Sequence, residues 1–177
     1  NGPYGPNNFW EGDSWKWFNG DPPLDEIGRE LMNPTGLNNN VRHWVIRRWI
    51  STVSGRLSVT WTMAKPSDLG AGVTGRVLHN GTLRDALTLS GSTAAPVSRN
   101  VIFNDVQVGD AIDIALDPTG SGNSFGDGGD LCYVTAVIRG SPSVTRHITS
   151  DIQGSMQNVN ASAYVRLPFN VANPALF

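Results

Sequence analysis

A strict alternation of apolar and polar side chains is the feature that most limits how this chain can fold. Between residues 57 and 63 every even position is Ser or Thr, and the odd positions are Leu57, Val59, Trp61 and Met63. Successive side chains of a β-strand point to opposite faces, so the pattern predicts an antiparallel strand with one buried face and one solvated face. A helix would instead need apolar residues three or four positions apart.

Other segments repeat this pattern between turn signals. Residues 73–79 and 82–89 flank Asn80 and Gly81, a pair that favours the positive φ angles of a type I′ hairpin turn. About eight or nine short strands with minimal helix predict an all-β fold, an antiparallel β-sandwich of the jelly-roll type. The remaining expected strands cover residues 14–18, 97–103, 111–116, 132–138 and 161–169.

Shifts in composition divide the chain into a module at residues 1–140 and a tail at residues 141–177. Residues 1–43 are rich in Gly, Pro and Asn but carry several large aromatic side chains. We therefore expect them to form an ordered, loop-rich cover over one end of the sandwich, with helical turns at residues 25–32. The tail is expected to hold a linker, a short helix at residues 149–156 and a C-terminal strand, or to begin a next domain.

Charge and composition favour a secreted, extracellular or cell-surface protein. Charged residues make up only 16% of the 177 residues, and the net charge of −2 includes no basic block, so we expect no nucleic acid partner. No stretch reaches the roughly 20 apolar residues of a membrane span, so we expect no membrane insertion. The opening residues NGPYGPNNFW are no signal peptide, so such a peptide would have been removed or would lie outside the chain. The single Cys132 lies in an apolar run and is expected to be a buried core residue.

Several short patterns resemble a known kind of module. RRWIS at residues 47–51, then GRLSVTW, GRVLHNGT and VQVGDAIDIALDPTG, lead into an Asp-rich turn before YVTAVI. Over about residues 10–139 the chain resembles a β-sandwich module of large secreted or surface proteins of environmental bacteria, which is similar to carbohydrate-binding modules. The resemblance implies sugar binding beside polysaccharide-degrading or cell-surface domains. The tail DIQGSMQNVNASAYVRLPFNV resembles the start of an adjacent lectin-like domain.

Tryptophans near the N-terminus are the candidate ligand-binding residues. Trp15 and Trp17 are two positions apart, so in a strand their indoles share one face. The C–H faces of sugar rings stack on indole, whereas the hydroxyl rim needs polar partners. The alternative is that these tryptophans pack in the core, as we expect for Trp44, Trp49 and Trp61. The candidate ligand-binding residues are Trp10, Trp15, Trp17, Asn19, Asp21 and Arg48.

A second candidate site lies in the glycine-rich stretch DPTGSGNSFGDGGD. Its carboxylates and its Asn carbonyl suit Ca²⁺, which binds six to eight oxygen atoms with loose geometry. The bidentate Glu of an EF-hand is absent, so the alternative is a polar loop whose Asp side chains cap turns. The expected ligands of a structural Ca²⁺ are Asp117, Asn123, Asp127 and Asp130.

No pattern of catalytic residues stands out. His43, His79 and His147 are far apart in sequence and belong to no metal or nucleophile motif, and His79 is expected to be an exposed hairpin residue. The sequence therefore predicts a non-catalytic carbohydrate-binding module of an extracellular multidomain protein, with a polysaccharide or glycan as partner. One alternative is a structural or adhesive assembly subunit that pairs strands with neighbouring domains or copies by strand addition. A polysaccharide-active enzyme is the other alternative.

Overall fold

The computed structural model describes residues 8–10, 12–17, 25–38, 41–124, 126 and 128–140. The side chains of residues 8–10, 17, 37 and 38 are outside this description. The expected helix at residues 149–156 and the expected strand at residues 161–169 both lie outside the described residues, so they stay predictions.

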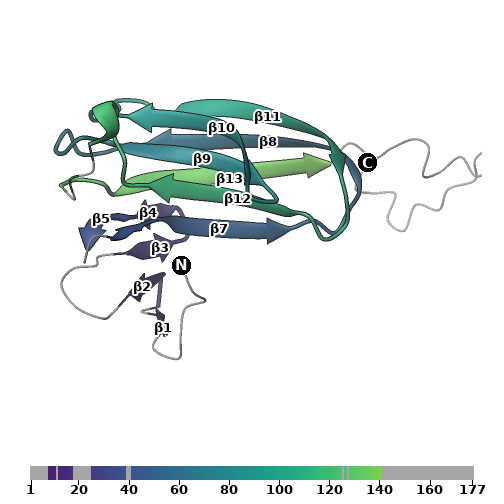
Figure 1. Cartoon of the computed structure of the whole chain (residues 1–177), viewed down its shortest axis with the longest axis horizontal. Helices are drawn as coiled ribbons and strands as arrows, with labels where there is room; N and C mark the ends of the chain where they lie inside the picture. The colour runs from purple at the N-terminus through teal and green to yellow at the C-terminus, as the bar shows by residue number, and fades with distance from the viewer. Residues whose placement is uncertain are drawn as a thin grey trace, which may run out of the picture. The chain divides into compact units, whose positions relative to one another are not determined.

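Two antiparallel sheets form a β-sandwich, as predicted (Figure 1). One sheet has the strand order β10-β9-β12-β7, and the other contains the order β4-β13-β8-β11. Among these eight strands only β9 and β10 are consecutive neighbours in one sheet, and every other step along the chain crosses to the opposite sheet. This connectivity is that of a jelly roll. The strands are β4 (Leu31–Asn33), β7 (Val45–Ile50), β8 (Gly55–Ala64), β9 (Val73–His79), β10 (Thr82–Leu89), β11 (Val97–Val106), β12 (Ala111–Asp117) and β13 (Cys132–Gly140).

The N-terminal segment contributes more strands than the loop-rich cover with one strand at residues 14–18 that the sequence predicted. Strands β1 (Asn8–Trp10), β2 (Ser14–Trp17) and β3 (Glu26–Gly28) continue the larger sheet beyond β4, so that this sheet has seven strands. Strands β5 (Thr35–Asn38) and β6 (Val41–His43) form a separate two-stranded sheet. The two main sheets are therefore unequal in width, with seven strands facing four.

The prediction of helical turns at residues 25–32 is wrong. These residues form the antiparallel pair β3–β4, in which Ile27 lies opposite Met32. Met32 is buried in the core and Ile27 packs against it. Ile27 and Leu31 are spaced as on a helix face, but tertiary packing of a hairpin overrides so weak a local preference.

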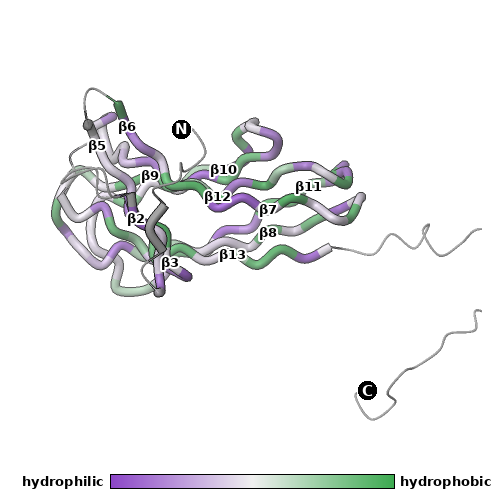
Figure 2. The backbone as a smooth tube through the Cα atoms, turned by 90° about the horizontal axis from the view of Figure 1, so that it is seen from below, coloured by the Kyte–Doolittle hydropathy of each residue, from purple (hydrophilic) through white to green (hydrophobic). Residues whose placement is uncertain are grey.

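The core lies between the two sheets and is built by the alternating positions seen in the sequence. The odd residues of β8 from Leu57 to Met63 are all buried, which confirms the predicted orientation of this strand. Fully burying a large apolar side chain stabilises a fold by about 1.5–3 kcal/mol. In a view turned by 90°, β8 runs between β11 and β13, with which it pairs (Figure 2). The largest buried apolar side chains are Trp61, Phe103, Met32, Leu57, Met63, Ile112 and Leu116.

Two local features of the sequence match their predicted geometry. Asn80 and Gly81 have φ angles of 48° and 79°, as the hairpin turn between β9 and β10 requires. Cys132 is buried, and this burial raises the pKa of its thiol to about 12, so the side chain is an inert core residue.

Candidate functional site

The exposed tryptophan of the described residues lies on β2, where the larger sheet extends past the smaller one. Trp15 is opposite Ile27, Ile27 is opposite Met32, and Met32 is opposite Cys132. Opposed residues of antiparallel strands share a face, so Trp15 lies on the face that carries the core at Met32 and Cys132. The smaller sheet ends at β7, and the Trp15 side chain is 46% exposed. We call this face of β1, β2 and β3 the overhang.

The backbone of the overhang brings the predicted tryptophan positions together. Trp10 is the cross-strand partner of Trp15, and Trp17 follows Trp15 by two residues on the same strand. The three residues therefore occupy positions on one face of the β1–β2 pair. The next residue of β2, Lys16, points to the opposite face, where its Nζ lies 3.9 Å from Glu26 Oε1 on β3. Asn19 and Asp21, the polar partners predicted for this face, lie outside the described residues.

Arg48 is not part of the overhang. It lies on the outer face of the smaller sheet, where its Nε and Nη2 donate to the two carboxylate oxygens of Asp113 at 2.7 and 2.8 Å. These hydrogen bonds raise the pKa of Arg48. Arg47 points the opposite way, into the space between the sheets, as expected for adjacent residues of one strand.

An open groove of about 370 Å³ lies between the two sheets along β7 and β13. Strand β4 pairs with β13 only at Cys132 and Tyr133, so residues 135–140 have a strand partner on one side only within the described part of the chain. The groove runs along this edge of β13. Its apolar walls are Trp49, Ile112, Ile114, Ala136 and Ile138, and its charged residues are Arg29, Glu30, Arg47 and Arg48.

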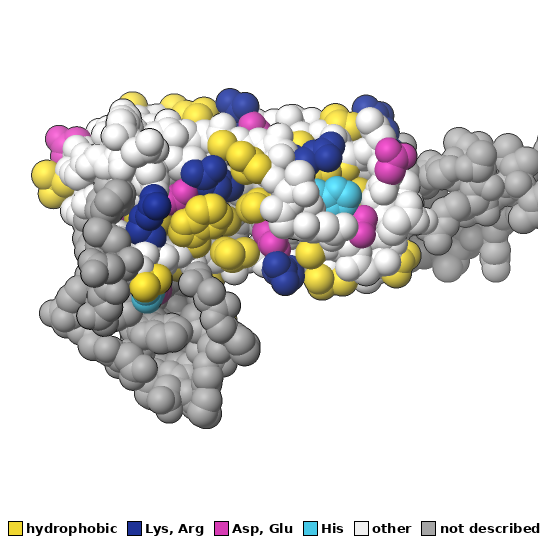
Figure 3. All heavy atoms as spheres, in the orientation of Figure 1, with side chains coloured by type: hydrophobic (Ala, Val, Ile, Leu, Met, Phe, Trp, Pro, Cys, Tyr) yellow, Lys and Arg dark blue, Asp and Glu magenta, His cyan; other side chains and the backbone are white. Residues whose placement is uncertain are grey.

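Trp44 is not a core residue, contrary to the sequence-based expectation. It is half-buried, and the guanidinium carbon of Arg76 lies 5.0 Å from the centre of its ring. Arg76 in turn donates to Asp117 Oδ2 from Nε and Nη2 at 2.9 and 2.7 Å. Trp61 is buried as predicted, and Trp49 is partly buried against the core. On the face shown in Figure 3, basic, acidic and apolar side chains intermix without a large patch of one kind.

The predicted calcium ligands are only partly described, and those that are described do not form a site by themselves. Asp117 Oδ1 accepts from the Thr119 amide at 2.9 Å, and its other oxygen binds Arg76, so this carboxylate is held by protein groups. Asn123 is exposed with a φ of 58°, and Asp130 is buried. No group of three His, Cys, Asp or Glu side chains among the described residues could hold a metal ion. Asp127 lies outside them.

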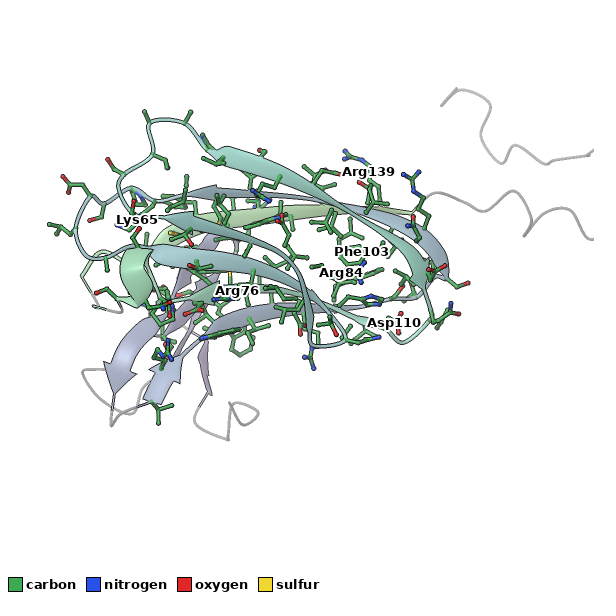
Figure 4. All side chains as sticks on the ribbon, turned by 45° about the horizontal axis from the view of Figure 1, so that its top comes forward. Lys65, Arg76, Arg84, Phe103, Asp110 and Arg139 are labelled. Carbon is green, nitrogen blue, oxygen red and sulfur yellow. The ribbon has the colours of Figure 1, made fainter. Side chains whose placement is uncertain are left out.

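His79 is half-buried rather than an exposed hairpin residue. Its Nε2 lies 2.8 Å from Asp110 Oδ2, and its ring meets Phe103 edge-on at 5.4 Å. Asp110 also accepts from the Gln107 amide and from Asn80 Nδ2, and these hydrogen bonds, the Gln107 amide first, lower the pKa of Asp110 to about 2. Figure 4 shows Phe103 and Asp110 at the same end of the sandwich. These hydrogen bonds of Asp110 join the β9–β10 turn at Asn80 to the β11–β12 turn at Gln107, so the role of this group of residues is structural.

Comparisons with known proteins give little beyond the fold. No family model matches the chain, and no curated protein matches it. Among solved structures the chain is similar to the CBM36-1 domain of a multidomain xylanase from the hindgut metagenome of Trinervitermes trinervoides. The two share 16% sequence identity and a TM-score of 0.37, over 62% of this chain and 87% of that one. In the described part of the chain no helix is long and apolar enough to cross a membrane.

Proposed function

We propose that this domain is a non-catalytic carbohydrate-binding module of an extracellular multidomain protein, and that the overhang is its ligand surface. The observation that carries the proposal is the 46% exposure of Trp15 on the overhang. Tryptophan is enriched at interaction surfaces, because its ring offers a large apolar face and an N–H donor.

Sugar rings fit this surface for a chemical reason. The axial C–H bonds of a pyranose form an apolar face that stacks on indole, and its hydroxyl groups need hydrogen-bonding partners at the edge. The hydrogen-bonding partners expected at this edge are Asn19 and Asp21, which lie outside the described residues. Lys16 and Glu26 do not supply them, because they lie on the opposite face of the sheet. An exposed strand surface suits an extended polysaccharide, because successive rings can bind along it without a deep pocket.

The test is the substitution Trp15→Ala, measured as retention of the protein on insoluble cellulose, xylan and chitin. We expect retention to be lost while the melting temperature stays within about 2 °C, because an exposed side chain contributes little to stability, usually within 0.5 kcal/mol. The matched control is Tyr133→Ala, which removes an equally exposed aromatic (49%) of the same sheet from the opposite face. Equal retention of the Trp15→Ala variant and the native protein would contradict the proposal.

One observation favours a structural role as the second candidate. Residues 135–140 of β13 have no strand partner on the side away from β8 within the described part of the chain. Val137 on this strand is an exposed apolar residue. An unpaired strand edge can accept a strand from another chain, which is how an assembly or adhesion subunit would join its neighbours.

A further inference from the structure

We propose that the groove between β7 and β13 binds a negatively charged sugar unit, a uronate, through Arg29 and Arg47. This inference rests on the proposed function only in taking the ligand to be a carbohydrate. The groove is a second site, separate from the Trp15 indole, and its residues are not those that sequence reasoning singled out for sugar stacking.

Arg47 is the central residue of the argument. Its Nη1 donates to Val134 O, and its Nη2 donates to Gly28 O and Leu31 O, at 2.6, 2.6 and 3.0 Å. A guanidinium group has five N–H donors, so two remain for a ligand. All three protein acceptors are neutral carbonyls, so no carboxylate within hydrogen-bonding distance balances the charge. Burial lowers the pKa of Arg47, which is the sign of a cation held away from water.

The other charged residues leave the groove basic. Arg48 is already neutralised by its paired hydrogen bonds to Asp113. Arg29 is exposed, and the structure gives it no hydrogen bond or ion pair with another described residue. Two guanidinium groups, from Arg29 and Arg47, therefore stand against the one carboxylate of Glu30. Planar guanidinium groups bind carboxylates through paired hydrogen bonds, and Glu30 is an acceptor for sugar hydroxyls.

The walls of the groove suit the ring rather than the charge of such a ligand. Trp49, Ile112 and Ile138 supply apolar surface for the C–H face of a sugar. A volume of about 370 Å³ lies at the small end of ligand pockets, which span about 300–1,000 Å³. A free phosphate would leave these walls unused, and a neutral sugar would leave one of the two guanidinium groups, Arg29 or Arg47, without a carboxylate, because Glu30 supplies only one.

The experiment compares two polymers that differ only at the carboxyl group, which is charged in one and a neutral methyl ester in the other. Polygalacturonate and its methyl ester share one backbone, so affinity electrophoresis in gels that contain either polymer isolates the role of the carboxylate. We expect the native protein to bind polygalacturonate at least tenfold more tightly than the ester. We expect Arg29→Gln to lower this affinity at least tenfold, as for loss of one charge-assisted hydrogen bond. The matched control is Arg56→Gln, which removes an exposed arginine from the outer face of the larger sheet.

A second pair of variants tests the groove without changing charge. Ala136→Phe fills the groove from its wall, whereas Val137→Phe places the same ring on the other face of β13. We expect only Ala136→Phe to abolish the preference for polygalacturonate. Methyl NMR with sodium glucuronate should shift signals of Ile112, Ile114 and Ile138, and methyl glucoside should not shift them.

Three outcomes would overturn the inference. The first is equal affinity for the two polymers, and the second is equal loss of affinity in Arg29→Gln and Arg56→Gln. The third is a shift of the groove methyl signals with protein concentration but not with glucuronate, because a second copy would then occupy the groove. The two proposals fail separately: Trp15→Ala tests retention on neutral polysaccharides, whereas Arg29→Gln tests the acidic one.

Discussion

Single residues decide how closely the two sheets can approach. A Cβ atom added at Gly75 would lie 2.1 Å from Met63 Sδ and 2.6 Å from Trp61 Cζ3. Glycine at this position of β9 therefore makes room for the indole of Trp61, whose Nε1 donates to Asp85 Oδ2 at 3.0 Å. The alternation in the sequence predicted that Trp61 is buried, but not that a glycine across the core would be needed to accommodate it.

The first prediction concerns this close contact. Gly75→Ala should lower the free energy of unfolding by about 1–3 kcal/mol, because an overpacked core forces side chains from their preferred rotamers. Urea denaturation measures the effect. The control is Gly91→Ala, where an added Cβ would meet no atom within 4 Å and we expect no measurable change. Equal stability of the two variants would show that the sheets can move apart at no cost.

The second prediction concerns pH and follows from Asp110. Its pKa is about 2 in the folded protein against a usual value of 3.8, so its hydrogen bonds stabilise the fold above pH 4. This contribution is lost as the pH falls from about 4 through 2, because protonation of the folded state then requires breaking those hydrogen bonds. The melting temperature of the native protein should fall more steeply over this range than that of Asp110→Asn. Parallel curves for the two proteins would contradict the prediction.

At the scale of elements, local patterns were sufficient where the turn residues between two strands specify the pairing. The hairpin of β9 and β10 follows from Asn80 and Gly81 alone. The pair β3–β4 could not be predicted in this way, because Ile27 and Met32 adopt strands only against a core that forms far away in sequence. For the candidate site, the strand at residues 14–18 was predicted, but the exposure of Trp15 was not, because it depends on the unequal widths of two sheets.

The third prediction concerns the loop between β12 and β13, for which calcium stays a proposal. Asp117 is held by Arg76, so a bound ion would need Asp127 and Asp130 with Asn123. If it binds there, EDTA should lower the melting temperature of the native protein and leave that of Asp127→Asn unchanged. Binding to the native state stabilises by about 2.7 kcal/mol at a hundredfold excess over Kd. Identical melting curves with and without EDTA would contradict calcium binding and favour the alternative, a polar loop whose Asp side chains cap turns.

At the scale of the whole molecule, the edge of β13 that has no strand partner among the described residues is the feature that distinguishes a binding module from an assembly subunit. An unpaired strand edge favours self-association unless charges or a cover block it. Arg139 lies on this strand and is exposed, and like-charged side chains of two copies would repel if their edges met in register.

The fourth prediction is therefore that the chain is a monomer in solution. Sedimentation velocity at increasing protein concentration should give one species of about the mass of a single chain, 19.0 kDa. The variant Arg139→Val removes the exposed charge and should increase any association. A native dimer that Val137→Lys dissolves would support the assembly role instead.

Because the two sheets have unequal widths, the residues that stabilise the fold are separate from those of the proposed ligand surface. Trp61 and Trp15 belong to the same sheet, yet Trp61 is held by atoms on every side and Trp15 is not. A change at Trp61 disturbs the core, whereas under the proposed function a change at Trp15 affects mainly what the overhang binds. Related chains could therefore exchange the residues of the overhang freely, and so come to prefer different ligands, while the eight strands of the jelly roll keep one architecture.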